Sequence, residues 1–400
     1  MRARSTGAAI LALALGGFAI GTTEFVTMGL LKEIAAGIDA SIPQTGHVIT
    51  AYALGVVVGA PVIVALGARL PRRELAIGLV LALGLGNALT AMVDGYVPVL
   101  VARFLAGLPH GAYFGVASLL AASLVAPHRR GRAVSRVMLG LSVATVAGVP
   151  AATWLGQQLG WRAAYWAVLA IALVAAALLA LVVPHQPGDP HASVRGELSA
   201  LARPQVLYAV AAGTVGFGGV FAMYSYIAPI VTDVTGRPDA AIPWFLFVFG
   251  VGSVLGTWAA GPLADRDVPR LVAGGFVASV LVLVAFHETA QWVVPALAGV
   301  FVIGALGSLL AIGLQIRMMD AAGDAKMLGA ALNHSALNVA NGLGAALGGL
   351  VIDAGLGLLA PSLVGAALAL GGLVIFAAGL RAGRRGARRV PAAQEAVPSS

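Results

Sequence analysis

The chain has 400 residues, of which 60% are hydrophobic and only 10% are charged, and its mean hydropathy is +0.95. Soluble globular proteins carry about a quarter charged residues, so this composition excludes that class and predicts a polytopic membrane protein. The net charge of +8 could suggest nucleic acid as a partner, but the basic residues lie mainly in short loops between apolar stretches, which argues against it.

Twelve apolar stretches are long enough to cross a bilayer as helices, which takes about 20 residues each. They are unbroken runs of Ala, Leu, Val and Gly, without the alternating polarity of a transmembrane β-barrel. The first is too long for a signal-peptide core of about 7–15 residues and is expected to be a mature span. The predicted spans are residues 7–31, 45–68, 74–93, 98–125, 134–158, 162–183, 205–232, 241–264, 270–287, 290–316, 328–352 and 360–380.

The first span contains Glu24, the only carboxylate deep inside any of the apolar stretches. A buried acid is costly unless it is neutralised or paired, so Glu24 predicts a group that binds a proton or a substrate in a membrane pathway. The alternative is a helix-packing acid that stays protonated and is held by Thr22, Thr23 or a neighbouring helix.

The fourth span combines a cation with small residues. Gly107, Gly111 and Gly115 recur at every fourth position and predict a groove that admits another helix closely. Arg103 lies about five residues inside the span, so its side chain could extend outward to the membrane surface. Alternatively it pairs with Glu24 or another anionic group and stabilises the ionised carboxylate.

The fifth span has small residues at strict four-residue intervals and a proline in its middle. This spacing predicts one tightly packed face, and Pro150 removes a backbone donor and permits a bend. A generic tight helix pair is the alternative explanation. The small residues are Gly140, Ala144, Gly148, Ala152 and Gly156.

An internal repeat divides the chain into halves. Gly55 and Gly59 in the second span correspond to Gly252 and Gly256 in the eighth, 197 residues later. A repeat of this length predicts an all-α integral membrane fold of two pseudo-symmetric six-helix bundles, with a substrate site between them near the midplane. The predicted parts are a first bundle (1–183), a cytoplasmic linker (184–204), a second bundle (205–382) and a basic, disordered cytoplasmic tail (383–400).

The eleventh span carries a polar run, in which His334, Asn338 and Asn341 fall at i, i+4 and i+7 on one helix face. This face could bind a polar substrate or join a neighbouring helix through hydrogen bonds. The candidates to line a central cavity are Tyr52, His110, Tyr113, Phe114, Tyr224, His334, Asn338 and Asn341.

The basic residues also predict the topology. With both termini in the cytoplasm, 20 of the 24 Lys and Arg residues fall on the cytoplasmic side, and only Lys32, Arg162 and Arg237 fall outside. This asymmetry satisfies the positive-inside rule. The predicted location is the plasma (inner) membrane, with both termini cytoplasmic.

Several kinds of chemistry have no signal in the sequence. There is no cysteine, and His110 and His334 do not lie at metal-ligand spacing with another ligand, so we expect no metal site. No nucleotide-binding loop is present, which argues against ATP as an energy source. No catalytic set lies at membrane depth, so we expect neither an enzyme nor a cofactor.

Twelve spans in two halves, with basic loops after the second and eighth, resemble the major facilitator superfamily. Within it the chain resembles the twelve-span drug:proton antiporter group, especially efflux permeases of the arabinose, chloramphenicol and purine type. The resemblance implies that Arg103, in an Arg-x-x-x-Gly motif, takes part in proton coupling. It also implies that Gly140, Gly148 and Pro150 belong to the antiporter motif that marks exporters, although Val149 separates the glycine from the proline.

The segment 261–270 is similar to the superfamily's loop motif Gly-x-x-x-Asp-Arg-x-x-x-Arg. Paired charges there could lock the cytoplasmic face closed and release when the bundles rock. The first-half copy, 64–73, departs from the pattern, with Val64 for the glycine and Ala68 for the aspartate. Ordinary positive-inside anchoring is the alternative for both copies. The predicted cytoplasmic gate comprises Arg72, Arg73, Asp265, Arg266 and Arg270.

The leading hypothesis is a secondary active transporter, a monomer in the lipid bilayer, that exports a small amphipathic molecule in exchange for protons. Drugs, sugars and nucleobase-like molecules are the substrate classes considered. The same-class alternative is a proton-coupled uptake symporter or a facilitator of a small metabolite. A non-transporting sensor is disfavoured because only about 20 residues follow the last span.

Overall fold

The computed structural model describes residues 3–67, 70–126, 129–186, 203–322 and 326–389, and within these ranges the secondary structure is helical. A helix pairs its backbone N–H and C=O groups internally, which is necessary in a bilayer because hydrocarbon offers no hydrogen-bond partners. The first-bundle elements are α1 (Ala3–Gly29), α2 (Leu31–Gly37), α3 (Ile42–Gly67), α4 (Arg72–Met92), α5 (Tyr96–Ser123), α6 (Arg130–Val143), η2 (Ala144–Gly148), α7 (Val149–Leu159) and α8 (Arg162–Val182).

The second bundle is also helical within its described residues. Its elements are α10 (Pro204–Tyr224), α11 (Ile227–Pro229), η4 (Ile230–Val234), η5 (Asp239–Ala241), α12 (Ile242–Arg266), α13 (Val268–Thr289), α14 (Val293–Ala322), α15 (Lys326–Asp353) and α16 (Ala360–Arg389).

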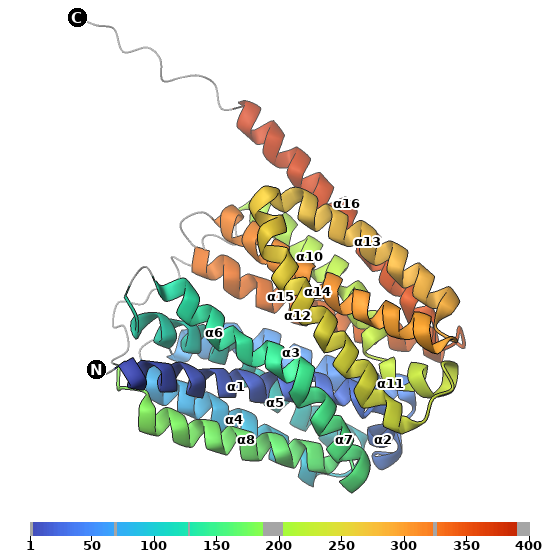
Figure 1. The fold of residues 1–400 in the computed structure, drawn as a ribbon, viewed down its shortest axis with the longest axis horizontal. Coiled ribbons are helices and arrows are strands. Elements are labelled where there is room, and N and C mark those ends of the chain that lie inside the picture. The colour runs from blue at the N-terminus through green and yellow to red at the C-terminus, as the bar shows by residue number, and fades with distance from the viewer. Residues whose placement is uncertain (1–2, 68–69, 127–128, 187–202, 323–325, 390–400) are drawn as a thin grey trace, which may run out of the picture.

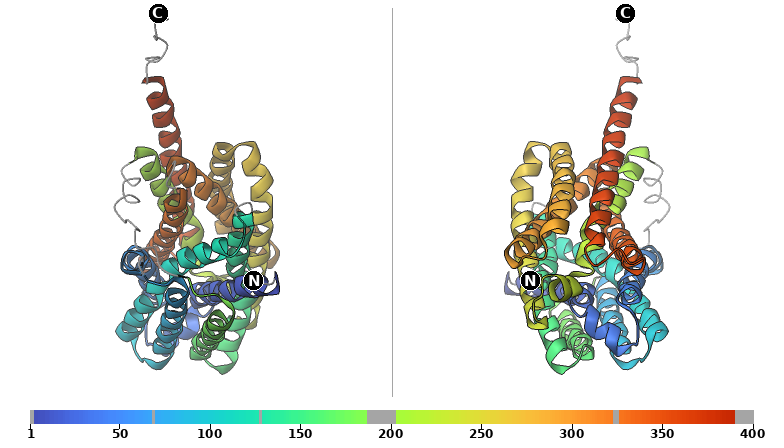
Figure 2. Two further views of the ribbon diagram at one scale, coloured as in Figure 1. Left: turned by 90° about the vertical axis from the view of Figure 1, so that its left-hand side faces the viewer. Right: turned by 90° about the vertical axis from the view of Figure 1, so that its right-hand side faces the viewer.

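The predicted spans coincide closely with these helices. Among the described residues, eleven helices are long and apolar enough to cross a membrane. The remaining predicted span coincides with α3, a helix of 26 residues that packs against α5 and α15 but does not belong to those eleven. The linker stays a prediction, because residues 187–202 lie outside the described ranges. Helix α16 runs to Arg389, into the segment predicted as a disordered tail, and projects beyond the rest of its bundle (Figure 2).

The repeat has a clear packing basis in close backbone contacts at glycine. A Cβ on Gly55 would lie 2.1 Å from the Phe104 carbonyl oxygen, and a Cβ on Gly252 would lie 2.1 Å from that of Phe301. Phe301 follows Phe104 by the same 197 residues that separate the two glycines. The helix pairs α3–α5 and α12–α14 therefore use one packing geometry, which small residues make possible.

The two bundles meet at one end and diverge toward the other. In Figure 1 the first bundle lies below the second, and they converge where α2 and α11 lie, away from the N-terminus. We call this the outer end, since the charge pattern predicts that it faces outside, and we call the opposite end the inner end. First-bundle residues Met28, Leu31 and Ile49 share one apolar cluster with the second-bundle residues Tyr226 and Ile227.

The packing makes a stability prediction. Gly252→Ala should lower the free energy of unfolding by about 1–3 kcal/mol, because its methyl group would collide with backbone rather than with a movable side chain. Gly274→Ala in the same bundle is the control, since a Cβ there meets nothing within 4 Å. Thermal unfolding in detergent should show a loss for the first variant only. Equal unfolding temperatures would contradict the packing argument.

Candidate functional site

Arg103 on α5 is fully buried in the first bundle. Its Nη1 donates to the Thr23 hydroxyl at 2.9 Å, and its Nη2 donates to the Thr23 carbonyl oxygen at 3.1 Å. Its exposed fraction is 0%. The alternative that this side chain extends outward to the membrane surface is therefore wrong, because α1 offers it acceptors inside the bundle.

Asn87 on α4 fixes the orientation of the Thr23 hydroxyl. Thr23 donates to the Asn87 Oδ1 at 2.5 Å, and Asn87 donates to the Leu83 carbonyl oxygen at 2.8 Å. A hydroxyl that gives its hydrogen to Asn87 has only lone pairs left for Arg103. Asn87 was not predicted as a site residue, although an amide inside the third predicted span was a visible signal.

Two aromatic rings complete the environment of the Arg103 guanidinium. Its central carbon lies 4.3 Å from the ring centroid of Tyr52 and 5.3 Å from that of Tyr165. Aromatic faces attract cations at such distances, more strongly when water is excluded. The Arg103 Nε is buried without a hydrogen bond in the described part of the chain.

Glu24 lies at the boundary between the bundles. Its exposed fraction is 7%, and the Arg103 charge and the Asn341 amide of α15 both act on its carboxyl group. No ion pair within 4 Å joins Glu24 to Arg103. Its neighbour Phe25 packs against Phe221 of the second bundle, with ring centroids 6.3 Å apart. Glu24 is thus enclosed by protein at the seam, with Arg103 held one residue away at Thr23.

Asn338 and Asn341 bring unpaired amides to the same region. Asn338 donates to the His334 carbonyl oxygen at 3.0 Å, but its Oδ1 is buried without a partner among the described residues. Among the described residues, the buried amide oxygen and nitrogen of Asn341 also have no hydrogen bond of regular geometry, although this amide acts on the Glu24 carboxyl group. Buried polar atoms without partners are uncommon in folded proteins, so these amides are suited to a polar ligand.

Four of the predicted cavity residues form one aromatic series across the seam. The Tyr52 hydroxyl lies 3.1 Å from the His110 Nδ1, and the His110 ring lies 5.5 Å from that of Phe114. Phe114 in turn stacks on His334 of the second bundle at 5.7 Å, with 9° between the ring planes. The series therefore connects the side of Arg103 to the polar face of α15.

Tyr113 and Tyr224 have different positions. The Tyr113 hydroxyl donates to the Leu13 carbonyl oxygen at 2.8 Å, which holds the ring between α5 and α1 inside the first bundle. Tyr113 precedes Phe114 on α5, and adjacent positions on a helix point in different directions. The prediction that Tyr113 lines the cavity therefore gains no support. Tyr224 stacks on Phe249 at 3.9 Å and also meets Phe25 at 6.3 Å.

The predicted antiporter motif lies where α1 meets the fifth span. A Cβ on Gly140 would lie 2.0 Å from the Ala14 carbonyl oxygen, and a Cβ on Gly148 would lie 2.4 Å from the Thr22 hydroxyl. The segment Ala144–Gly148 is a π-helical turn, and Pro150 follows at the start of α7. Single π turns interrupt regular helices and are frequent at functional sites.

The predicted cytoplasmic gate makes no ion pair between the bundles within the described ranges. Arg73 donates to the Ala180 carbonyl oxygen of its own bundle, and the Arg72 backbone N–H donates to the Gln186 carbonyl oxygen at 3.1 Å. Arg270 pairs at 3.4 Å with Asp267 rather than with Asp265. Asp267 also caps α13 by accepting from the Arg270 backbone N–H. Arg266 is exposed at the end of α12.

Comparison with known proteins identifies the family. The family model described as Major Facilitator Superfamily matches residues 13–327. The chain belongs to the major facilitator superfamily. It is 39% identical over 368 residues to the inner membrane transport protein YdhP of Escherichia coli (strain K12), which covers 92% of this chain and 95% of that protein.

Two further proteins extend the comparison. A chloramphenicol resistance protein of Streptomyces lividans is 37% identical over 353 residues, covering 86% of this chain and 88% of that protein. A bacterial homologue of the human lysosomal transporter Spinster, in an inward-facing and unoccupied conformation, shares the fold with a TM-score of 0.74 and 16% identity over 97% of this chain and 98% of that one. The chain is therefore a major facilitator transporter of small molecules, and not an enzyme.

The hydrogen bonds around Arg103 generate a prediction. Thr23→Val should lower the free energy of unfolding by about 1.5–3 kcal/mol, because a buried charged donor loses its acceptor. Thr23→Ser keeps the hydroxyl and should lose much less, as measured by thermal unfolding in detergent. Equal losses for the two variants would mean that the threonine methyl group matters and the hydrogen bond does not.

Proposed function

We propose that this transporter exports small amphipathic molecules in exchange for protons, and that Glu24 carries the proton. The observation that carries the proposal is the position of Glu24, a buried carboxyl group at the seam, with Arg103 on its own side and Asn341 on the other. A carboxyl group in such a place is costly to ionise, and a nearby guanidinium lowers that cost. Its charge is therefore sensitive to small changes in the spacing of the bundles.

Alternating access supplies the coupling. When Glu24 is ionised, it attracts the Arg103 guanidinium, which Thr23 holds beside it. When Glu24 is protonated, this attraction is lost and the carboxyl group becomes a neutral hydrogen-bond partner for Asn341. A proton drives exchange only if proton and substrate favour different states of the two-bundle equilibrium. Competition between them for the seam around Glu24 meets this requirement.

The antiporter motif gives the charge change a route to the second bundle. The π turn contacts α1 beside Thr22, two residues before Glu24. The same turn contacts α12, because a Cβ on Gly250 would lie 2.5 Å from the Thr145 carbonyl oxygen. A shift of α1 therefore moves a segment that lies directly against the opposite bundle. In the proposal this contact supports export, in agreement with the resistance function named for the Streptomyces relative.

The substrate site in this proposal lies next to the proton site. The aromatic rings of Phe25, Phe221 and Tyr224 offer apolar faces, and the amides of Asn338 and Asn341 offer donors and acceptors. Such a mixture suits a molecule that has both an apolar body and polar groups. Accumulation assays in a deletion strain with chloramphenicol-like drugs, sugars and purines would narrow the substrate class.

Proteoliposomes test the role of Glu24. Glu24→Gln should reduce substrate flux driven by a pH gradient by about tenfold or more, within the usual range of coupling between two ligands. Substrate exchange without a gradient should persist, because the amide keeps the shape of the side chain.

The matched control is Glu288→Gln, which changes an exposed carboxylate on α13 and should leave the flux unchanged. Unchanged gradient-driven flux in Glu24→Gln would remove Glu24 from the mechanism. Net movement of substrate and protons in the same direction, instead of in opposite directions, would favour a symporter.

A further inference from the structure

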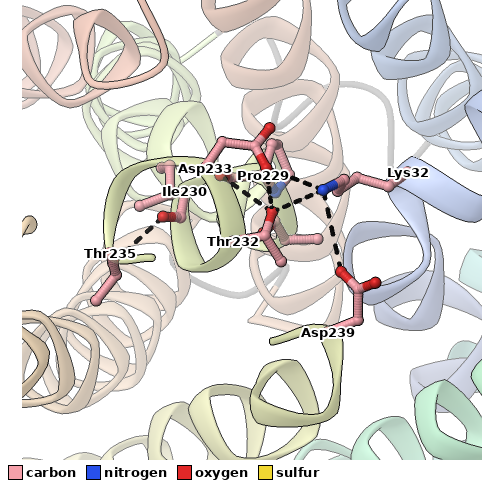
Figure 3. Close-up of polar contacts among 8 residues, drawn as sticks. Lys32, Pro229, Ile230, Thr232, Asp233, Thr235 and Asp239 are labelled. Carbon is pink, nitrogen blue, oxygen red and sulfur yellow. Dashed lines mark hydrogen bonds and ion pairs between the residues drawn. The ribbon is translucent and has the colours of Figure 1, made fainter. Parts of the chain in front are cut away.

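Lys32 on α2 reaches across the outer end to the second bundle (Figure 3). Its Nζ donates to the Thr232 hydroxyl and to the Asp233 carboxylate, each at 2.9 Å, and lies 4.0 Å from the Asp239 carboxylate. One first-bundle cation is therefore shared by three oxygen-bearing side chains from two neighbouring segments of the second bundle, η4 and η5.

The acceptors on the second bundle are held in place. Thr232 donates to the Asp233 carboxylate at 2.7 Å, so its lone pairs are left for Lys32. Thr235, at the end of η4, donates to the Ala290 carbonyl oxygen at 2.8 Å, which braces the segment against the end of α13. The cation thus meets a preformed group rather than loose side chains.

A second polar contact follows the same line. Gln157, near the end of α7, donates to the Asp239 carbonyl oxygen at 2.9 Å. Two helices of the first bundle therefore bind the 232–239 segment. Burial raises the pKa of Glu33, beside Lys32, with a further contribution from the charge of Asp239.

Among the described residues, Lys32 is the cation that forms ion pairs between the two bundles. Arg162 pairs with Asp94 within the first bundle, and Arg270 pairs with Asp267 within the second. His185, just after α8, pairs with Glu74 of the first bundle. The outer end is therefore closed by charge as well as by the apolar cluster, whereas the predicted gate residues at the inner end make no ion pair with the opposite bundle in the part of the chain that the structure describes.

We propose that Lys32 with Thr232, Asp233 and Asp239 forms a reversible latch that holds the outer mouth of the transporter closed. The Lys32 and Asp233 side chains remain 33% and 49% exposed. Water can therefore compete for them, and the latch can break in each cycle, as an exposed ion pair of modest strength must. The latch does not depend on proton exchange, only on the rocking of two bundles.

The charge of Asp233 persists when the outside becomes acidic. Partial burial would raise its pKa, but the hydrogen bonds from Thr232 and Lys32 and the Lys32 charge outweigh this effect and lower it. A carboxylate with a lowered pKa keeps its partner until the pH falls below its ordinary value of about 4. External acidification in the working range should therefore leave this ion pair intact.

The absence of cysteine from the sequence allows a direct test. Ile49→Cys places one thiol in the apolar cluster shared by the bundles, where the native side chain is 1% exposed. Labelling by a membrane-impermeant maleimide, applied from outside to cells or right-side-out vesicles, then reports opening of the outer mouth. Lys32→Gln and, separately, Asp233→Asn should raise the labelling rate roughly two- to fivefold, the range for exposed ion pairs.

The matched control is Arg162→Gln, which removes an outer ion pair of the same cation exposure, 33%, that lies within one bundle. It should leave the labelling rate unchanged. The charge exchange Lys32→Asp with Asp233→Lys should return the rate toward that of the parent protein.

Three results would overturn the latch. They are an unchanged rate in both single variants, an equal increase in Arg162→Gln, or an increase seen only when inside-out vesicles are labelled. Thermal unfolding of each variant separates specific opening from general loosening, which would lower the unfolding temperature together with faster labelling. The flux assay on Glu24→Gln tests proton coupling and the labelling assay tests the latch, so the two proposals can fail independently.

Discussion

Close contact between helix backbones at glycine is the constraint on which this structure depends. In hydrocarbon there is no hydrophobic force between apolar helices, so helices associate through tight packing and polar contacts. Gly55 and Gly252 rest on carbonyl oxygens of the opposing helix in the same way in both halves. These contacts hold the helices of each bundle tightly together.

Helix α1 connects the packed interior of the first bundle to the candidate site. Thr23 faces Arg103 and Asn87 within the first bundle, while Glu24 and Phe25 face the second. Successive positions on a helix point about 100° apart, so one turn of α1 presents one face to Arg103 and another to the second bundle. The two terminal nitrogens of the buried Arg103 guanidinium donate to Thr23, and the Glu24 carboxyl group makes no direct ion pair with Arg103.

The two ends of the seam differ in their chemistry. At the outer end, an apolar cluster is reinforced by Lys32 and Gln157 on the segment from Thr232 to Asp239. At the inner end, Arg73 and Arg270, two of the arginines predicted as a gate, contact their own bundles. A transporter must open and close each end of the seam in turn, so the open and closed states need similar free energies. Exposed polar contacts allow this, because water replaces each bond that breaks.

The helices, their repeat and the placement of an acid inside the first of them could be predicted from the sequence, because hydropathy and the spacing of small residues act locally along the chain. The π turn before Pro150 could be anticipated only as a bend. The partner of Arg103 could not be read, since whether an arginine meets Glu24 or Thr23 depends on the rotation of α1 relative to α5. Asn87, Lys32 and Asp233 gained their importance only from the tertiary structure, where residues up to 201 positions apart come within hydrogen-bond distance.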